Sequence, residues 1–243
     1  MKSSGSVSIV AAGVVALIGA VSSAQAAEVG KAVVRSVRGH AQYAEGGQWL
    51  ELKPGQVLKP GASIRTANES QVDLFLDQNG PMVRLVENTT LGIDKLNFEA
   101  TGIETVMETQ LDLKSGRILG IVKKMAHNSK YEIKTPNGVA GIRGTRYRMS
   151  ANSFIVLLDG TMVYVYVPPG AGGTPTPYTL AAPPAQYFAP TEGIKPAPID
   201  LVKEVRDQFQ HGPPFTPPGP PAGVPFKEPF ISPGTGKPAN TPP

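Results

Sequence analysis

The chain of 243 residues has no cysteine, three histidines and one tryptophan. The absence of cysteine excludes a disulfide scaffold, a thiolate zinc site, an iron–sulfur cluster and a cysteine nucleophile. His40, His127 and His211 are the only histidines, so few of the usual acid–base groups and metal ligands are available. We therefore expect no enzyme activity, no metal and no cofactor.

Proline is scarce in the first two thirds of the chain and abundant after them. Only four of the 25 prolines precede residue 168, namely Pro54, Pro60, Pro81 and Pro136. A segment so rich in proline cannot bury enough apolar surface to offset the entropy lost on ordering. The composition thus predicts a globular part up to about residue 167 and a different kind of chain beyond it.

The apolar run at residues 7–21 is shorter than the roughly 20 residues that a membrane-spanning helix needs. Lys2 precedes it, and Ala24 and Ala26 stand where signal peptidase requires small residues. We predict a signal peptide at residues 1–26, with cleavage after Ala26. The mature protein should then carry no transmembrane anchor and be periplasmic or secreted.

Basic residues outnumber acidic ones by 23 to 19, and they concentrate between residues 123 and 148, where Glu132 is the single acid. An exported chain rarely meets nucleic acid, so we expect no such partner. An anionic wall polymer, an acidic protein and a merely solvated face all fit this pattern. The possible face for an anionic partner comprises Lys123, Lys124, Lys130, Lys134, Arg146 and Arg148.

The body of the chain shows short stretches of alternating apolar and polar residues, which is typical of β-strands. Asn79-Gly80 and Asp159-Gly160 are tight-turn dipeptides, which predict hairpin-like or solenoid corners. Strands that recur about every ten residues favour an all-β sandwich, barrel, roll or solenoid. The expected strands include residues 72–76, 82–85, 111–113, 131–134, 154–158 and 162–167.

An internal repeat is visible within this β-rich part. Residues 64–68 (IRTAN) recur as residues 133–137 (IKTPN), and residues 74–83 recur as residues 156–163. The second copy contains an insertion that includes residues 138–148. We expect two related β units, stacked as in a solenoid or facing each other as in a sandwich, that bury a common face.

A fixed order of single residues also runs through this part. It has a tryptophan strand, two glycine turns, a Thr-Pro step, an Arg-Gly-Thr triplet and an Asp-Gly turn. With this order the chain resembles the FecR domain family over roughly residues 29–167. The resemblance implies an all-β periplasmic module in which these hallmark residues are structural. They are Trp49, Gly55, Gly61, Thr66, Thr135, Pro136, Arg143, Gly144, Thr145, Asp159 and Gly160.

The segment around the Arg-Gly-Thr triplet has glycines at positions 138, 141 and 144, which predicts a tight loop with close backbone approach. The guanidinium of Arg143 can hold loop carbonyls or pair with a carboxylate, for which Asp159 and Asp77 are candidates. A ligand contact by Arg143 is the alternative. Residues 77–80 resemble a calcium loop only faintly, because Phe75 and Val86 stand where acidic ligands belong.

The β domain is expected to span residues 27–194 and to end with one more short hairpin. Apolar residues spaced three to four apart predict an amphipathic helix at residues 200–210, within a linker of residues 195–211. A helix so short either docks on the β domain or folds on a partner. Residues 212–243 are expected to form a disordered, proline-rich tail that acts as a tether or as a ligand for an aromatic groove.

Two functions fit these features. The first is a non-catalytic binding or scaffold module of the bacterial cell envelope that contacts a protein or a wall polysaccharide. The second is a periplasmic signal-transduction module that works with a separate anti-sigma regulator and an outer-membrane receptor. Regulators of the FecR family carry a cytoplasmic anti-sigma segment and a transmembrane helix before the periplasmic domain. Because this chain has a predicted signal peptide there instead, a separate protein would have to supply the anti-sigma segment. The oligomeric state does not follow from the sequence.

Overall fold

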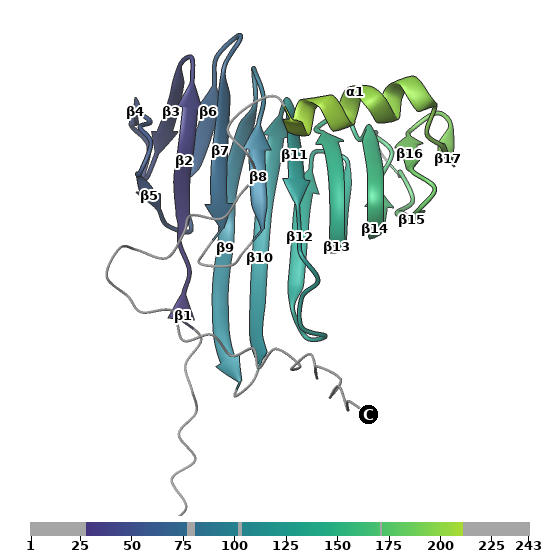
Figure 1. Ribbon diagram of the computed structural model, residues 1–243, viewed down its shortest axis with the longest axis horizontal. Coiled ribbons are helices and arrows are strands. Elements are labelled where there is room, and N and C mark those ends of the chain that lie inside the picture. The colour runs from purple at the N-terminus through teal and green to yellow at the C-terminus, as the bar shows by residue number, and fades with distance from the viewer. Residues whose placement is uncertain (1–27, 77–80, 102–103, 171, 211–243) are drawn as a thin grey trace, which may run out of the picture.

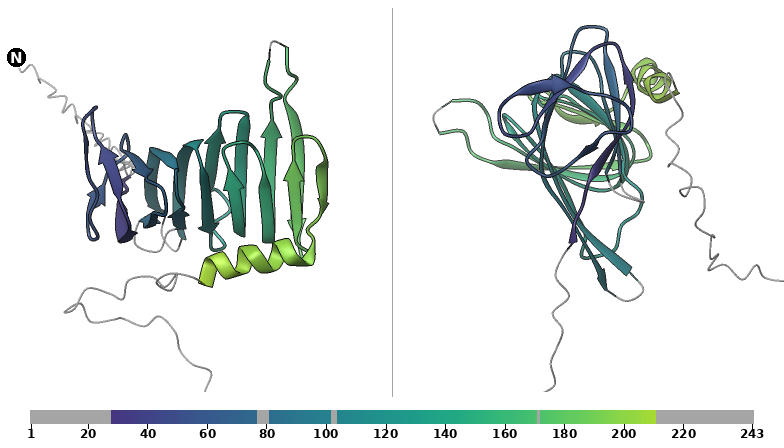
Figure 2. Two further views of the ribbon diagram at one scale, coloured as in Figure 1. Left: turned by 90° about the horizontal axis from the view of Figure 1, so that it is seen from above. Right: turned by 90° about the vertical axis from the view of Figure 1, so that its left-hand side faces the viewer.

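The computed structural model describes residues 28–76, 81–101, 104–170 and 172–210. In these residues seventeen strands pair into one continuous sheet, accompanied by one helix. The sheet curls around a single core into a flattened, barrel-like roll with two facing layers (Figures 1 and 2). The predicted all-β architecture with one short helix is confirmed. The predicted signal peptide, the Asn79-Gly80 turn and the tail of residues 212–243 lie outside the described residues.

The two layers are defined by strand pairing, which is antiparallel everywhere except between β10 and β12. Layer A begins, in spatial order, with β4 (Trp49–Glu51), β3 (Ala41–Ala44), β6 (Ser63–Thr66), β9 (Thr90–Thr101) and β10 (Glu104–Ser115). It continues with β12 (Lys130–Thr135), the first half of β13 (Gly138–Ser150), the second half of β14 (Ile155–Tyr166) and β15 (Thr176–Ala182). The short strand β1 (Glu28–Val29) also pairs with β9. Layer B contains β5 (Val57–Leu58), β2 (Ala32–Arg38), β7 (Gln71–Leu76), β8 (Met82–Leu85), β11 (Arg117–Ile121), the other halves of β13 and β14, β16 (Gln186–Ala189) and β17 (Gly193–Pro196).

The chain winds alternately through the two layers, as in a solenoid, while the layers face each other, as in a sandwich. The repeated segments keep equivalent places in this winding. β6 and β12 run in the same direction in layer A, and β7 and the first half of β14 run in the same direction in layer B. The sequence repeat therefore corresponds to related strands that lie further along one curled sheet.

The core lies between the layers and is built by the inward residues of the alternating strands. Ile64 and Ile133 point into it from layer A, and Leu74 and Leu157 from layer B, all fully buried. Each such side chain contributes roughly 1.5–3 kcal/mol through removal of apolar surface from water. The alternation of apolar and polar residues in the sequence thus matches the alternation of buried and exposed side chains along these strands.

Two sequence expectations about local structure are wrong. Asp159-Gly160 does not form a hairpin turn, because it lies inside the 12-residue strand β14. Residues 138–144 are not a loop, because they form the first half of the 13-residue strand β13. In both places the glycines permit a bend within a long strand, and this bend carries the strand from one layer into the other.

Helix α1 (Ile199–Gln210) forms close to the predicted boundaries and docks across the outer face of layer B (Figure 2). Val205 is fully buried against Val156 and Leu158 of β14. Of the two alternatives for this helix, the structure shows docking on the β domain. No helix in the described ranges is both long and apolar enough to cross a membrane.

Candidate functional site: the bend between the layers

The layers are joined where β13 and β14 pass together from layer A into layer B. We call residues 143–146 of β13 and residues 159–161 of β14 the bend; the pairing register of the two strands shifts here. Gly144 has φ +59° and Gly160 has φ +86°, a left-handed conformation that glycine adopts without strain. A Cβ atom on Gly160 would lie 2.0 Å from the carbonyl oxygen of Gly144. Both glycines are therefore required by backbone geometry.

A loop of residues 122–129 lies beside the bend and connects β11 of layer B with β12 of layer A. Val122 donates its backbone N–H to the carbonyl of Thr145, at 2.8 Å. Thr145 is 1% exposed, and its hydroxyl has no hydrogen-bond partner within the described part of the chain. Thr145 thus holds this loop through its backbone carbonyl.

The arginines of the bend have fixed partners. Arg143 donates to the carbonyl of His127 in the adjacent loop. Asp159 accepts a hydrogen bond from the backbone N–H of Arg146, at 2.9 Å, and pairs with the guanidinium of the same residue. Asp159 is therefore the partner of Arg146 and not of Arg143, while Asp77 lies outside the described residues.

The two repeated threonines are buried at the ends of equivalent strands. Thr66 donates its hydroxyl to the carbonyl of Val86 (2.5 Å) and accepts from the backbone N–H of Thr89 (3.0 Å). The hydroxyl of Thr135 lies 3.0 Å from that of Tyr164. Pro136 follows at the exposed turn into β13. Both threonines therefore satisfy polar groups inside the roll.

The first hallmark residues lie far from the bend. Trp49 is at the edge strand β4, where the guanidinium carbon of Arg65 lies 4.2 Å from its ring centroid. Gly55 and Gly61 occupy turns with φ +84° and +95°. The structure thus brings Arg143, Gly144, Thr145, Asp159 and Gly160 together and leaves the other hallmark residues elsewhere on the roll.

The expected basic face is divided by the fold. Arg148 is 4% exposed on the outer side of layer B, beneath α1, where its Nη1 donates to Glu204 at 2.7 Å. Lys134 projects from layer A and pairs with Asp94 at 2.9 Å. Hydrogen bonding to Asp94 raises the pKa of Lys134. Arg148 therefore lies apart from the other basic residues, and the charge of Lys134 is offset by Asp94.

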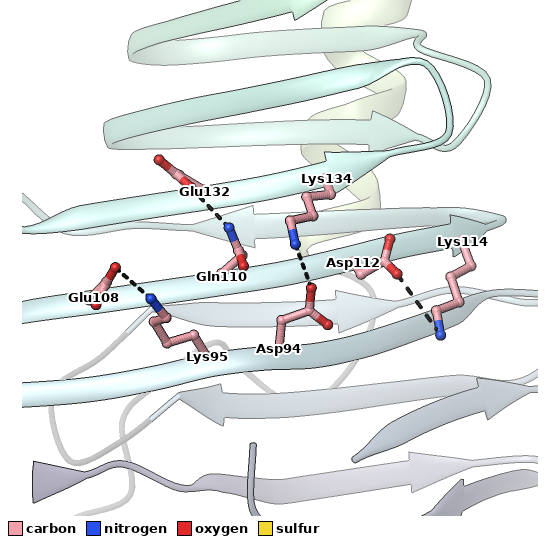
Figure 3. Close-up of polar contacts among 8 residues, drawn as sticks. All are labelled: Asp94, Lys95, Glu108, Gln110, Asp112, Lys114, Glu132 and Lys134. Carbon is pink, nitrogen blue, oxygen red and sulfur yellow. Dashed lines mark hydrogen bonds and ion pairs between the residues drawn. The ribbon is translucent and has the colours of Figure 1, made fainter. Parts of the chain in front are cut away.

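Lys134 and two other lysines of layer A all have acidic partners. Oppositely charged side chains alternate across β9, β10 and β12 (Figure 3). Lys95 lies 3.0 Å from Glu108, and Lys114 lies 3.9 Å from Asp112. Gln110 donates to Glu132 at 3.2 Å. Each of the three lysines in this ion-pair row therefore has an acidic partner, and Glu132 adds one further carboxylate to the central outer face of layer A.

Unbalanced positive charge remains beside the bend. Lys123 and Lys124 lie in the adjacent loop, Lys130 begins β12, and Arg143 belongs to the bend itself; all four are exposed. Within the described residues, no acidic side chain forms an ion pair with any of them. We call Lys123, Lys124, Lys130 and Arg143 the bend cluster.

A hollow of about 380 Å³ opens next to the bend cluster. Lys130 and Arg143 line it together with Gly141 and Val163, and the carboxylate of Glu132, which accepts a hydrogen bond from Gln110, lines it as well. Thr161 adds a hydroxyl. Two cations against one carboxylate leave this hollow with a net positive charge, which suits a ligand that carries carboxylate or phosphate groups. In the described ranges, no three histidine, aspartate or glutamate side chains are grouped to hold a metal ion.

Sequence reasoning missed a buried ion pair on the other layer. Asp73 of β7 and Arg84 of β8 are 2% and 1% exposed, and two bonds of 2.6 and 3.0 Å join them. Ser36 donates to the same carboxylate, and Arg84 also donates to the carbonyl of Gln208 in α1. The only sequence signal was a charged residue in each of two very apolar strands.

Two buried tyrosines predict a loss of stability at alkaline pH. The hydroxyls of Tyr131 and Tyr147 lie 3.3 Å apart in the core, and burial raises the pKa of both phenols above their ordinary 10.0. Above pH 10 only the unfolded chain releases these protons. Each tyrosine should therefore lower the free energy of unfolding by about 1.4 kcal/mol per pH unit.

Urea unfolding of the wild type and of Tyr131→Phe at pH 9 and pH 11 measures this effect. The variant should lose less stability between the two values. An equal loss in both proteins would show that Tyr131 does not contribute.

Comparison with known proteins gives one match. Residues 62–164 match the family described as FecR protein, a stretch that includes the bend, the loop beside it and both repeated threonines. Trp49, Gly55 and Gly61 precede the matched stretch. No curated protein and no solved structure matches the chain. The match and the resemblance seen in the sequence agree, and residues 62–164 are a domain of the FecR family.

Proposed function

We propose that the chain is a non-catalytic, exported FecR-like module of the bacterial cell envelope that binds an anionic partner at the bend. The bend cluster carries this proposal, because none of its four exposed cations forms an ion pair among the described residues, and two of them, Lys130 and Arg143, line a hollow in which Glu132 is the single acid. A carboxylate-rich protein segment or an acidic wall polymer supplies the complementary charge. The proposal that the chain is exported rests on the signal peptide predicted at residues 1–26.

The FecR match favours a second function in envelope signalling, with a separate anti-sigma regulator and an outer-membrane receptor as partners. Both functions use a binding surface, and they differ in what is bound. A photo-crosslinking amino acid at Thr161, which is exposed in the hollow, should capture the partner in cells. Wall material or a structural envelope protein supports the scaffold, and a membrane regulator or receptor supports signalling.

Charge reversal at the bend should weaken this binding. In the double variant Lys130→Glu with Arg143→Glu, recovery of the crosslinked partner should fall at least about tenfold, because two attractive contacts become repulsive. The matched control reverses Lys31 and Lys53, two exposed lysines at the other end of the roll. Equal recovery from both double variants would show that the bend is not the binding surface.

A further inference from the structure

A second group of arginines lies on the outer face of layer B, near the C-terminal end of α1. Arg84 and Arg148 have acidic partners, Asp73 and Glu204. Arg117, at the start of β11, has none: no ion pair or side-chain hydrogen bond of Arg117 occurs within the described part of the chain. This face therefore carries an uncompensated guanidinium among paired ones.

The position of Arg117 makes the lack of a partner costly. Its Nε is shielded from water and has no hydrogen-bond partner among the described residues, and the same is true of Nε of Arg148. Burial lowers the pKa of Arg148, and the positive charge of Arg117 lowers it further. A shielded donor of this kind calls for a missing partner, such as an ion. The charge of Arg148 is offset by Glu204, whereas no acid in the described part of the chain forms an ion pair with Arg117, which favours an anion beside Arg117.

There is room for such a partner. Arg117 lines a hollow of about 280 Å³, together with Arg38 and Gln71 from β2 and β7 and Gln208 from α1. Glu69 and Glu87 also line this hollow, and they are exposed. The carboxylate of Glu87 accepts a hydrogen bond from the backbone N–H of Glu69, at 3.0 Å. Because these two acids would repel a large polyanion that covers the whole hollow, a small anion that contacts only the arginines fits better.

We propose that this hollow binds a small oxyanion, a carboxylate or phosphate group, held by Arg117 and Arg38. The site lies on β2, β7, β8, β11 and α1 and shares no residue with the bend cluster, so it is independent of the function proposed above. Because Gln208 lines the hollow, a bound anion connects layer B with the end of α1. Occupancy should therefore stabilise the docked helix.

The test uses the full mature chain with inorganic phosphate and with acetate as probes, against sodium chloride at equal ionic strength. We expect millimolar phosphate or acetate to raise the Tm by about 2–5 °C and to slow hydrogen exchange in α1. The larger shift of the two identifies phosphate or carboxylate as the preferred group. Equal shifts with chloride, or no shift at all, would overturn the proposal.

Arginine variants test whether the rise in Tm arises from binding in this hollow. Arg117→Gln should abolish the shift, whereas Arg206→Gln, an exposed arginine on α1, should retain it. If Arg117→Gln does not fold, Arg38→Gln, which removes an exposed side chain, should reduce the response at least severalfold. A shift that survives in both Arg117→Gln and Arg38→Gln places the anion elsewhere and refutes this site.

Discussion

Alanine in place of Gly160 should lower the free energy of unfolding by about 3–5 kcal/mol. The new methyl group would lie 2.0 Å from the carbonyl oxygen of Gly144, and the residue would remain at φ +86°. Neither the backbone of β13 nor that of β14 can yield without breaking the pairing that joins the layers. Urea unfolding followed by circular dichroism measures the loss.

Two glycines of the partner strand β13 provide graded controls for this prediction. At Gly144 a Cβ would come no closer than 3.4 Å to its neighbours, so Gly144→Ala should cost only the strain of φ +59°, about 1 kcal/mol. At Gly141 the nearest atom is 3.9 Å away, and Gly141→Ala should change stability by less than about 0.5 kcal/mol. Equal costs at the three positions would contradict the geometry of the bend.

Removal of the Asp73 carboxylate should have a similarly large effect. Asp73→Ala removes the carboxylate that pairs with the buried guanidinium of Arg84, which should cost about 3–5 kcal/mol. Because Arg84 also donates to the carbonyl of Gln208, at 2.9 Å, α1 should exchange its amide protons faster in the variant. Urea unfolding and hydrogen exchange measure the two effects.

The exposed pair of Asp94 and Lys134 is the matched control, and Asp94→Ala should cost less than about 1 kcal/mol. The double variant Asp73→Leu with Arg84→Met should recover much of the stability lost in Asp73→Ala, because apolar residues of similar size do not leave a buried charge. A double variant that is less stable than Asp73→Ala would contradict this account.

The strands could be predicted from the sequence because one face of each layer is buried. Alternation of apolar and polar residues is enough to show this at residues 131–134 and 162–167. The helix at residues 199–210 followed from its apolar spacing in the same way, although where it docks depends on Val156 and Leu158, which are distant in sequence.

The bend, the buried ion pair and the hollow beside Arg117 depend on the register of strand pairing, which local sequence patterns do not contain. Asp159-Gly160 has the composition of a tight turn, and only the opposing Gly144 shows that it bends a continuous strand. Asp73 and Arg84 become partners because β7 and β8 pair in one particular register. Arg148 left the expected basic face because the bend carries its half of β13 into layer B.

Because β13 and β14 belong to both layers, they also determine when the roll can close during synthesis. Chain growth proceeds from the N-terminus, and β13 and β14 are the only strands that bridge the layers by pairing in the described part of the chain. Until residues 138–166 have emerged, β11 and β12 present unpaired edges above an open apolar interior. Such edges recruit other chains. A chain that ends before residue 138 should therefore aggregate, so assembly of this module depends on completing residues 138–166.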